Sequence, residues 1–251
     1  MPEVALFVTC LVDLHRPNVG FAAIRLLEQA GCQVSVPDAQ VCCGQPAFNS
    51  GDDDSARAIA RQVIDAFEGF EYVIVPSGSC AGMIVKHYPE LFAEEPEWLA
   101  RAESLAERCK ELVSFLVDTL GIEDTQTSFD GSVTYHDACS GLRELDIKQQ
   151  PRKLMTAVSG LELKEMDETE VCCGFGGTFC VKFPDISERM VTDKVALAEQ
   201  SGASYLLGGD MGCLLNISGR LSRLGSDMQV YHVAEVLAGM SDLPAIGKGE
   251  Q

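Results

Sequence analysis

Short apolar runs alternate with amphipathic stretches along the first half of the chain. Val4–Val8 is a run of strand-forming residues, and Pro17 then opens a pattern whose apolar residues share one helical face until Gly31. Gln33–Val36 alternates as a strand does, whereas residues 52–68 return to helical spacing. This alternation is typical of an α/β fold.

The second half of the chain repeats this order. We expect strands at Ser132–Tyr135 and Tyr205–Leu207, an extended stretch at Leu161–Met166 and an edge strand at Gln229–His232. The other predicted elements are a strand at Tyr72–Val75 that a turn joins to a helix, helices near residues 150–158 and 185–200, and a helix that begins at Asp210. Strands that alternate with helices predict mainly parallel sheets with right-handed crossovers.

A charged stretch, Glu94–Lys110, separates the two halves. It contains the only tryptophan, Trp98, and we interpret it as a helix with a connection. Together with Leu112–Leu120 it belongs to the first domain or bridges the two domains. The predicted domains are therefore residues 1–125, which include the helical connector, and residues 126–251.

Composition excludes several classes of function. The 251 residues are 46% apolar, which is enough to form the cores of two domains. With 38 acidic against 19 basic residues, the net charge is −19, which disfavours nucleic acid and anionic membranes as partners. The first apolar run follows Glu3 and no basic residue, and no run is long enough for a membrane span. We expect a cytoplasmic protein without a signal peptide.

The cysteines indicate a duplication. There are 11, an odd number, and in a reducing compartment metal binding or redox chemistry is favoured over a disulfide framework. Cys-Cys-Gly occurs twice, and four cysteines recur at offsets of 129 to 133 residues. The matched pairs are Cys10 and Cys139, Cys42 and Cys172, Cys43 and Cys173, and Cys80 and Cys213. The sequence therefore predicts two similar cysteine-rich α/β domains related by internal duplication, with a small insertion after the second Cys-Cys-Gly.

Three cysteines fall outside this repeat. Cys32 precedes a strand-like run and Cys109 lies in a helix-like stretch, and we interpret both as small buried hydrophobic residues. Cys180 lies seven residues after Cys173, inside a glycine-rich insertion. A structural role is favoured for Cys180, and a spare metal ligand or a redox thiol is the alternative.

The predicted positions of the repeated cysteines suggest two metal sites. They lie after strands, and ligands of open parallel sheets bind beyond the carboxyl ends of the strands, so each set of four is expected to share a crevice. Gly44 and Gly174 follow the paired cysteines, where they permit close approach and leave an N–H that can bond to sulfur. His136 and Asp137, just before Cys139, are candidates for a proton relay or for a capped strand end.

Four convergent cysteines leave three chemical options open. They can bind zinc or an iron–sulfur cluster, although neither repeat has the Cys-x2-Cys spacing that is usual in structural zinc sites. Without a metal, the adjacent cysteines can form a strained, easily reduced disulfide. The sequence contains no nucleotide-binding fingerprint and no serine hydrolase arrangement.

The repeated pattern resembles the CCG cysteine-rich domain that occurs in heterodisulfide reductase and in the iron–sulfur component of glycolate oxidase. More specific matches are found in the strings Phe7–Cys10, Cys42–Ala47, Glu95–Trp98, Cys172–Phe179 and Cys213–Arg220. Through them, nearly the whole chain is similar to the lactate utilization protein A family. This resemblance implies an iron–sulfur electron-transfer component of a complex that oxidises L-lactate to pyruvate, with companion subunits of which one carries ferredoxin-like clusters.

Carried over to this sequence, the resemblance implies one or two [4Fe–4S] clusters, with zinc as the alternative metal. The first ligand set would be Cys10, Cys42, Cys43 and Cys80, and the second Cys139, Cys172, Cys173 and Cys213. Each reductase repeat ends in Cys-x2-Cys, whereas Met83 and Asn216 stand at the corresponding positions here. This departure favours an ordinary four-cysteine cluster over an enlarged one. The alternatives are a heterodisulfide-reductase-like thiol/disulfide oxidoreductase and a non-redox zinc-binding or thiol scaffold.

Overall fold

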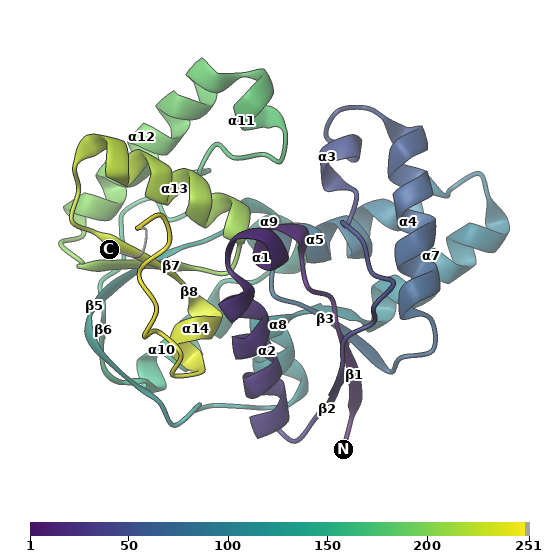
Figure 1. The fold of residues 1–251 in the computed structure, drawn as a ribbon, viewed down its shortest axis with the longest axis horizontal. Coiled ribbons are helices and arrows are strands. Elements are labelled where there is room, and N and C mark those ends of the chain that lie inside the picture. Colours follow the sequence, from purple (N-terminus) through teal and green to yellow (C-terminus); the bar gives the residue numbers. More distant parts are fainter. Residues whose placement is uncertain (249–251) are drawn as a thin grey trace.

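A computed structural model describes residues 1–248, which form two four-stranded parallel sheets with flanking helices (Figure 1). Residues 249–251, the end of the second predicted domain, lie outside this range. The first sheet has the order β2–β1–β3–β4 and the second the order β6–β5–β7–β8. The strands of the first sheet are β1 (Glu3–Leu6), β2 (Gln33–Ser35), β3 (Tyr72–Val75) and β4 (Cys109–Glu111). Those of the second are β5 (Ser128–His136), β6 (Ser159–Leu163), β7 (Tyr205–Gly208) and β8 (Gln229–His232).

The register of the strands confirms the predicted duplication. Val4 of β1 lies opposite Tyr72 of β3, and Val133 of β5 lies opposite Tyr205 of β7. The order of the strands and their parallel direction are also the same in both sheets. The predicted fold class, two similar α/β domains with parallel sheets, is therefore confirmed.

Helices connect the strands of the first half, and local sequence signals set several of their ends. Pro17 occupies the first position of α2, and the Asp52 side chain caps α4 by accepting a hydrogen bond from the Ser55 N–H. The helices are α1 (Cys10–His15), α2 (Pro17–Gln29), α3 (Gln45–Phe48), α4 (Asp53–Phe67), α5 (Gly78–Gly82), α6 (Tyr88–Leu91), α7 (Pro96–Arg108) and α8 (Leu112–Ser114). Two π-helical turns, Met83–His87 and Phe115–Thr119, extend α5 and α8.

The second half has a corresponding set of helices. Pro184 starts the longest of them, and Gly225 ends α13 in the left-handed conformation. These helices are α9 (Cys139–Leu145), α10 (Gln149–Ala157), α11 (Phe179–Lys182), α12 (Pro184–Gln200), α13 (Met211–Leu224) and α14 (Val233–Leu237). No helix within residues 1–248 has both the length and the apolar character needed to cross a membrane.

The strand β4 corrects one prediction. Cys109 was expected within a helix-like stretch, but α7 ends at Arg108 and Cys109 begins β4, opposite Val73. This strand has three residues, of which Lys110 and Glu111 are charged. Its sequence therefore lacks the apolar pattern that indicates a strand, and pairing with β3 determines its conformation.

The contacts between the two halves occur in matched pairs. Helix α14 packs on α2 and α8 on α10, and α5 packs on α9 and α1 on α13. In the duplication, α2 corresponds to α10, α8 to α14, α5 to α13 and α1 to α9. Each contact is therefore repeated with the two halves exchanged, which is the reciprocal arrangement of a two-fold dimer. Gly78 and Gly141 permit a close approach of α5 and α9, since a Cβ on Gly78 would lie 2.9 Å from the Gly141 Cα.

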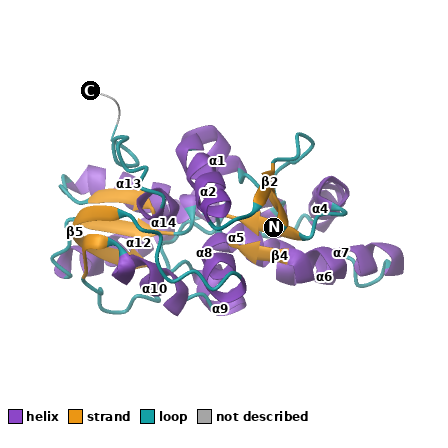
Figure 2. Cartoon of the chain, turned by 90° about the horizontal axis from the view of Figure 1, so that it is seen from below, coloured by secondary structure: helices purple, strands orange, loops and turns teal. Residues whose placement is uncertain are grey.

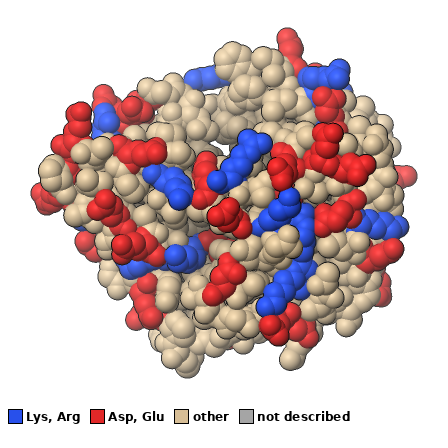
Figure 3. All heavy atoms as spheres, turned by 180° about the vertical axis from the view of Figure 1, so that it is seen from behind, with Lys and Arg blue, Asp and Glu red and all other residues tan. Residues whose placement is uncertain are grey.

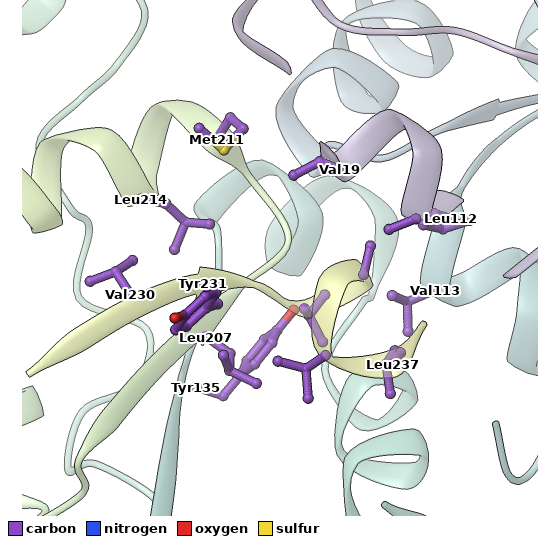
Figure 4. Close-up of a cluster of buried hydrophobic side chains, with 14 of the residues drawn as sticks. Val19, Leu112, Val113, Tyr135, Leu207, Met211, Leu214, Val230, Tyr231 and Leu237 are labelled. Atoms are coloured by element: carbon purple, nitrogen blue, oxygen red, sulfur yellow. The ribbon is translucent and has the colours of Figure 1, made fainter. Parts of the chain in front are cut away.

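One apolar core extends through both halves (Figure 4). It joins Val19 of α2 and Leu112 of α8 to Leu214 of α13 and Leu237 of α14. In both cartoon views α5, α8 and α14 lie between the two sheets (Figures 1 and 2). The two sheets are thus the outer parts of one packed structure.

Ion pairs accompany this apolar contact. The buried Glu235 carboxylate accepts a hydrogen bond of 2.8 Å from the Arg16 Nε, which links α14 to the start of α2.

On the face seen in Figure 3, basic side chains lie among acidic ones. That face therefore presents no continuous basic surface.

Candidate metal centres

The first predicted quartet gathers at the carboxyl ends of strands of the first sheet. Cys10 begins α1 after β1, Cys42 and Cys43 lie in the loop after β2, and Cys80 lies in α5 after β3. The sulfur atoms of Cys10 and Cys42 are 3.7 Å apart, and those of Cys43 and Cys80 are 3.3 Å apart. The structure thus brings together four thiols that lie up to 70 residues apart along the chain.

Hydrogen bonds in this quartet stabilise a thiolate. The Cys10 and Cys43 thiols and the Gly44 N–H lower the pKa of Cys42 to about 2. The same thiol contact, together with burial, raises the pKa of Cys10. The Cys42 sulfur is therefore favoured as an anion beside the Cys10 and Cys43 thiols, and thiolate is the form of cysteine that binds metals.

The second quartet repeats this arrangement. Cys139 begins α9, Cys172 and Cys173 lie in the loop after β6, and Cys213 lies in the first turn of α13. The thiols of Cys139 and Cys173 and the Gly174 N–H lower the pKa of Cys172 to about 2. The nitrogen of Gly174 is 3.4 Å from the Cys172 sulfur. The expected N–H to sulfur contact is present here.

The glycine after each cysteine pair has a conformation that favours glycine. Gly44 has φ +83° and Gly174 has φ +78°, both in the left-handed region. At Gly174 space is also restricted, because an added Cβ would lie 2.8 Å from the carbonyl oxygen of Ser187. These glycines set the turns that direct the paired sulfurs and N–H groups towards one another.

A cavity of about 230 Å³ opens beside the first quartet. Part of its wall is the loop after the second Cys-Cys-Gly, which contains the predicted insertion. This loop contacts the first half, where the Asn49 Nδ2 donates to the Gly176 carbonyl at 3.3 Å and the hydroxyls of Ser50 and Thr178 are 3.1 Å apart. The residues that the second half contributes to the cavity are Phe175, Gly177, Thr178, Asp210, Met211 and Gly212.

His136 distinguishes the second quartet from the first. One ring nitrogen of His136 and the sulfurs of Cys173 and Cys213 lie within 4.8 Å of one another. The ring is buried, and neither nitrogen has a hydrogen-bond partner among residues 1–248. Burial lowers the pKa of His136 to about 3, so the imidazole is neutral. Its neighbour Asp137 instead forms a two-pronged pair with Arg152, with both N–O distances 2.9 Å.

Lys194 is a buried residue near this quartet that sequence reasoning missed. Its exposed fraction is 0%, and its Nζ donates to the Thr169 carbonyl at 2.7 Å. The signal was present, because Lys194 lies beside Val195 on the apolar face of the predicted helix 185–200. A lysine at such a position is buried only with a compensating contact.

The remaining cysteines lie outside both quartets. Cys32 and Cys109 are buried among apolar residues, as the prediction of small hydrophobic side chains requires. Cys180 lies in α11, where its sulfur is 3.7 Å from the Gly177 carbonyl oxygen. At the two positions that lack a fifth cysteine, Met83 is fully buried and the Asn216 Nδ2 donates to the Cys173 carbonyl at 2.8 Å.

Comparison with known proteins places these quartets within a family. The cysteine-rich domain family CCG matches residues 4–85 and 133–218. Lactate utilization protein A of Bacillus cytotoxicus is 48% identical over 239 residues, which cover 95% of this chain and 100% of that protein. The protein of the same name from Geobacillus kaustophilus is 50% identical over 235 residues, covering 94% and 98% of the two chains.

A solved structure shows the same fold at low sequence identity. A hypothetical protein from Helicobacter pylori superposes with a TM-score of 0.69 at 13% identity, over 99% of this chain and 49% of that one. The family follows from the match to the CCG domain in both halves and from the near-complete coverage of the curated relatives. The chain belongs to the lactate utilization protein A family and contains two cysteine-rich CCG domains.

Proposed function

We propose that the chain is an iron–sulfur electron-transfer component of a complex that oxidises L-lactate to pyruvate. The relatives are named for lactate utilization, and the duplicated thiolate quartets are the observation that carries the electron-transfer role. The ligands would be Cys10, Cys42, Cys43 and Cys80 in the first centre, and Cys139, Cys172, Cys173 and Cys213 in the second. When bound, an iron–sulfur cluster supplies one-electron transfer.

The donor set fits a [4Fe–4S] cluster. Each quartet offers four sulfurs, one of them already held as a thiolate, and a glycine N–H directed at that sulfur. Zinc holds thiolate sulfurs about 2.3 Å away, so any two of its ligands lie within about 4.6 Å. Among residues 1–248, three potential metal ligands lie within 4.8 Å of one another at His136, Cys173 and Cys213. Within the same described range, the first quartet has no such group of three. The first quartet offers four cysteine sulfurs, with Cys10 and Cys42 3.7 Å apart and Cys43 and Cys80 3.3 Å apart, and four cysteines are the usual ligand set of a [4Fe–4S] cluster.

The residues around the first quartet argue against a lactate site there. A lactate carboxylate requires a cation or several N–H donors. The described residues that line the cavity include no Lys, Arg or His, and Asp210 adds a carboxylate that would repel the substrate. We therefore assign the chemistry on lactate to a companion subunit and electron transfer to this chain. The division into residues 1–125 and 126–251 and the cytoplasmic location are part of the same proposal.

The second quartet favours one alternative. The cluster of His136, Cys173 and Cys213 is compact enough for a single metal ion, so a zinc scaffold is the second candidate. A thiol/disulfide reaction of the heterodisulfide reductase type is less well supported, because Met83 is fully buried and Asn216 already bonds the Cys173 carbonyl.

Metal analysis separates these functions. We expect the chain, isolated without oxygen, to contain iron and acid-labile sulfide, and Cys43→Ser and Cys173→Ser each to lose about half of the iron. Cys32→Ala is the matched control, because that buried thiol lies outside both quartets, and it should retain all the iron. Stoichiometric zinc without iron in the wild-type chain and in Cys32→Ala would exclude the proposal.

A further inference from the structure

The cores behind the two quartets differ in charge, although their backbones match. Helices α4 and α12 bury residues at matched positions, 131 residues apart, with Val63 in one and Lys194 in the other. Likewise, buried His136 at the end of β5 occupies the position that Phe7 occupies in the first half, directly after β1. Phe7 packs on Phe67, with the ring centroids 5.3 Å apart. The first quartet is thus backed by apolar side chains and the second by a histidine and a lysine.

Lys194 brings a charge close to the second quartet, because its Nζ bonds at 2.7 Å to the carbonyl of Thr169, three residues before Cys172. Burial lowers the pKa of Lys194 to about 8, and the nearby Asp137 carboxylate and the Cys173 and Cys213 sulfurs oppose that shift. The ammonium therefore keeps its proton at pH 7. Asp137 pairs with Arg152, which also pairs with Glu165, and His136 is uncharged, so Lys194 supplies the fully buried positive charge on this side of the quartet.

The negative charge near the boundary of the two halves does not distinguish the centres. Asp210 lines the cavity of the first quartet, and its carboxylate also acts on Cys139 and Cys213 of the second. The buried Lys194 ammonium near the second quartet is therefore the charge that differs between the two sites. Retaining a lysine in a core is costly without such a role, since a buried charge is stabilised only by its partners.

We propose that Lys194 gives the centre held by the second quartet a higher reduction potential than the centre held by the first. This inference rests on the proposed iron–sulfur function. Reduction adds one electron and no proton to a centre, so its charge becomes more negative by one. A buried ammonium favours that reduced state, because opposite charges interact strongly where water is excluded.

Redox titration followed by electron paramagnetic resonance tests this order at pH 7, with oxygen excluded. In Cys43→Ser, which retains the second centre, the potential should be higher than in Cys173→Ser, which retains the first. In the wild-type background, Lys194→Met should shift the higher of the two potentials downward and leave the lower one in place. Lys153→Met is the matched control: it removes the same charge from an exposed residue, and both potentials should stay unchanged.

A second neutral variant distinguishes the loss of charge from a folding defect. Lys194→Gln retains an N–H donor for the Thr169 carbonyl and should shift the same potential as Lys194→Met. The proposal is overturned if the Cys43→Ser protein has the lower potential, or if both neutral variants keep wild-type iron and wild-type potentials. In those cases clusters are present and the proposed function stands. Absence of iron from the wild-type chain would remove both the function and this inference.

Discussion

The hydroxyl of Ser77 donates a buried hydrogen bond of 2.9 Å to the Oδ2 atom of Asp210, across the boundary between the two halves. Ser77 caps α5, the helix that carries Cys80, and Asp210 caps α13, the helix that carries Cys213. The two residues occupy matched positions of the duplication, 133 residues apart. This hydrogen bond thus joins the helix ends that position both quartets.

Removing the Asp210 carboxylate should destabilise this junction. Besides Ser77, it accepts hydrogen bonds from the backbone N–H groups of Ser79 and Gly212. Asp210→Ala leaves these buried donors unsatisfied, and we expect a loss of about 2 to 4 kcal/mol in the free energy of unfolding. Chemical denaturation measures it, with the half-exposed Asp193→Ala as a control that should change stability by less than about 0.5 kcal/mol. Equal losses in the two variants would contradict the role of this contact.

Substitution at Gly174 should affect the second centre specifically. Gly174→Ala combines left-handed backbone strain with a contact to the Ser187 carbonyl oxygen at 2.8 Å. The matched control is Gly31→Ala, where φ is +85° and an added Cβ meets nothing within 4 Å. We expect about 1 to 3 kcal/mol more destabilisation at Gly174 and loss of iron from that variant alone. Similar stability and iron content in both variants would show that the turn does not set the site.

The buried Glu111 should make stability depend on pH. Burial raises the pKa of Glu111 from 4.5 to about 7, so between these values the folded state holds a proton that the unfolded state has released. The contribution of Glu111 to the free energy of unfolding should therefore fall as pH rises from 4.5 to 7, by an amount on the order of 3 kcal/mol, whereas the buried His136 gives a slope of the opposite sign below pH 6.5. Glu111→Gln should remove the falling contribution and retain the hydrogen bond from the Ser114 N–H. Exposed Glu123→Gln is the control, and a slope unchanged by Glu111→Gln would count against the buried carboxyl.

Cysteines outside the quartets should be dispensable for metal binding. Cys180 is half-buried and contacts the Gly177 carbonyl rather than a quartet sulfur. Cys180→Ala should therefore retain the iron content and absorption spectrum of the wild type, whereas Cys172→Ala should not. Loss of iron from Cys180→Ala would identify Cys180 as a ligand, and the ligand set of the second centre would then have to include it.

The architecture could be predicted from the sequence because the duplication is visible in the repeated cysteine positions. The constant offsets of the cysteines predicted two equivalent crevices, and the structure gathers both quartets. The parallel strands follow from apolar runs such as Tyr72–Val75, which is strand β3 without change of bounds.

Other features depend on tertiary structure and had no local signal. The strand at Cys109–Glu111 is too short and too polar to be recognised, and it forms because β3 offers an edge. The hydrogen bond between Ser77 and Asp210 joins residues far apart in sequence and depends on how the halves pack. Lys194 was visible as a lysine among apolar positions, but its distance to the second quartet emerges only on folding.

The iron–sulfur role is tested most directly by Mössbauer spectroscopy of the chain, produced with isotope-enriched iron and isolated without oxygen. We predict the signal of sulfur-ligated [4Fe–4S] clusters, reduced to about half in Cys43→Ser and in Cys173→Ser and absent when both are combined. A chain without such a signal, or one whose signal survives the double substitution, would contradict it.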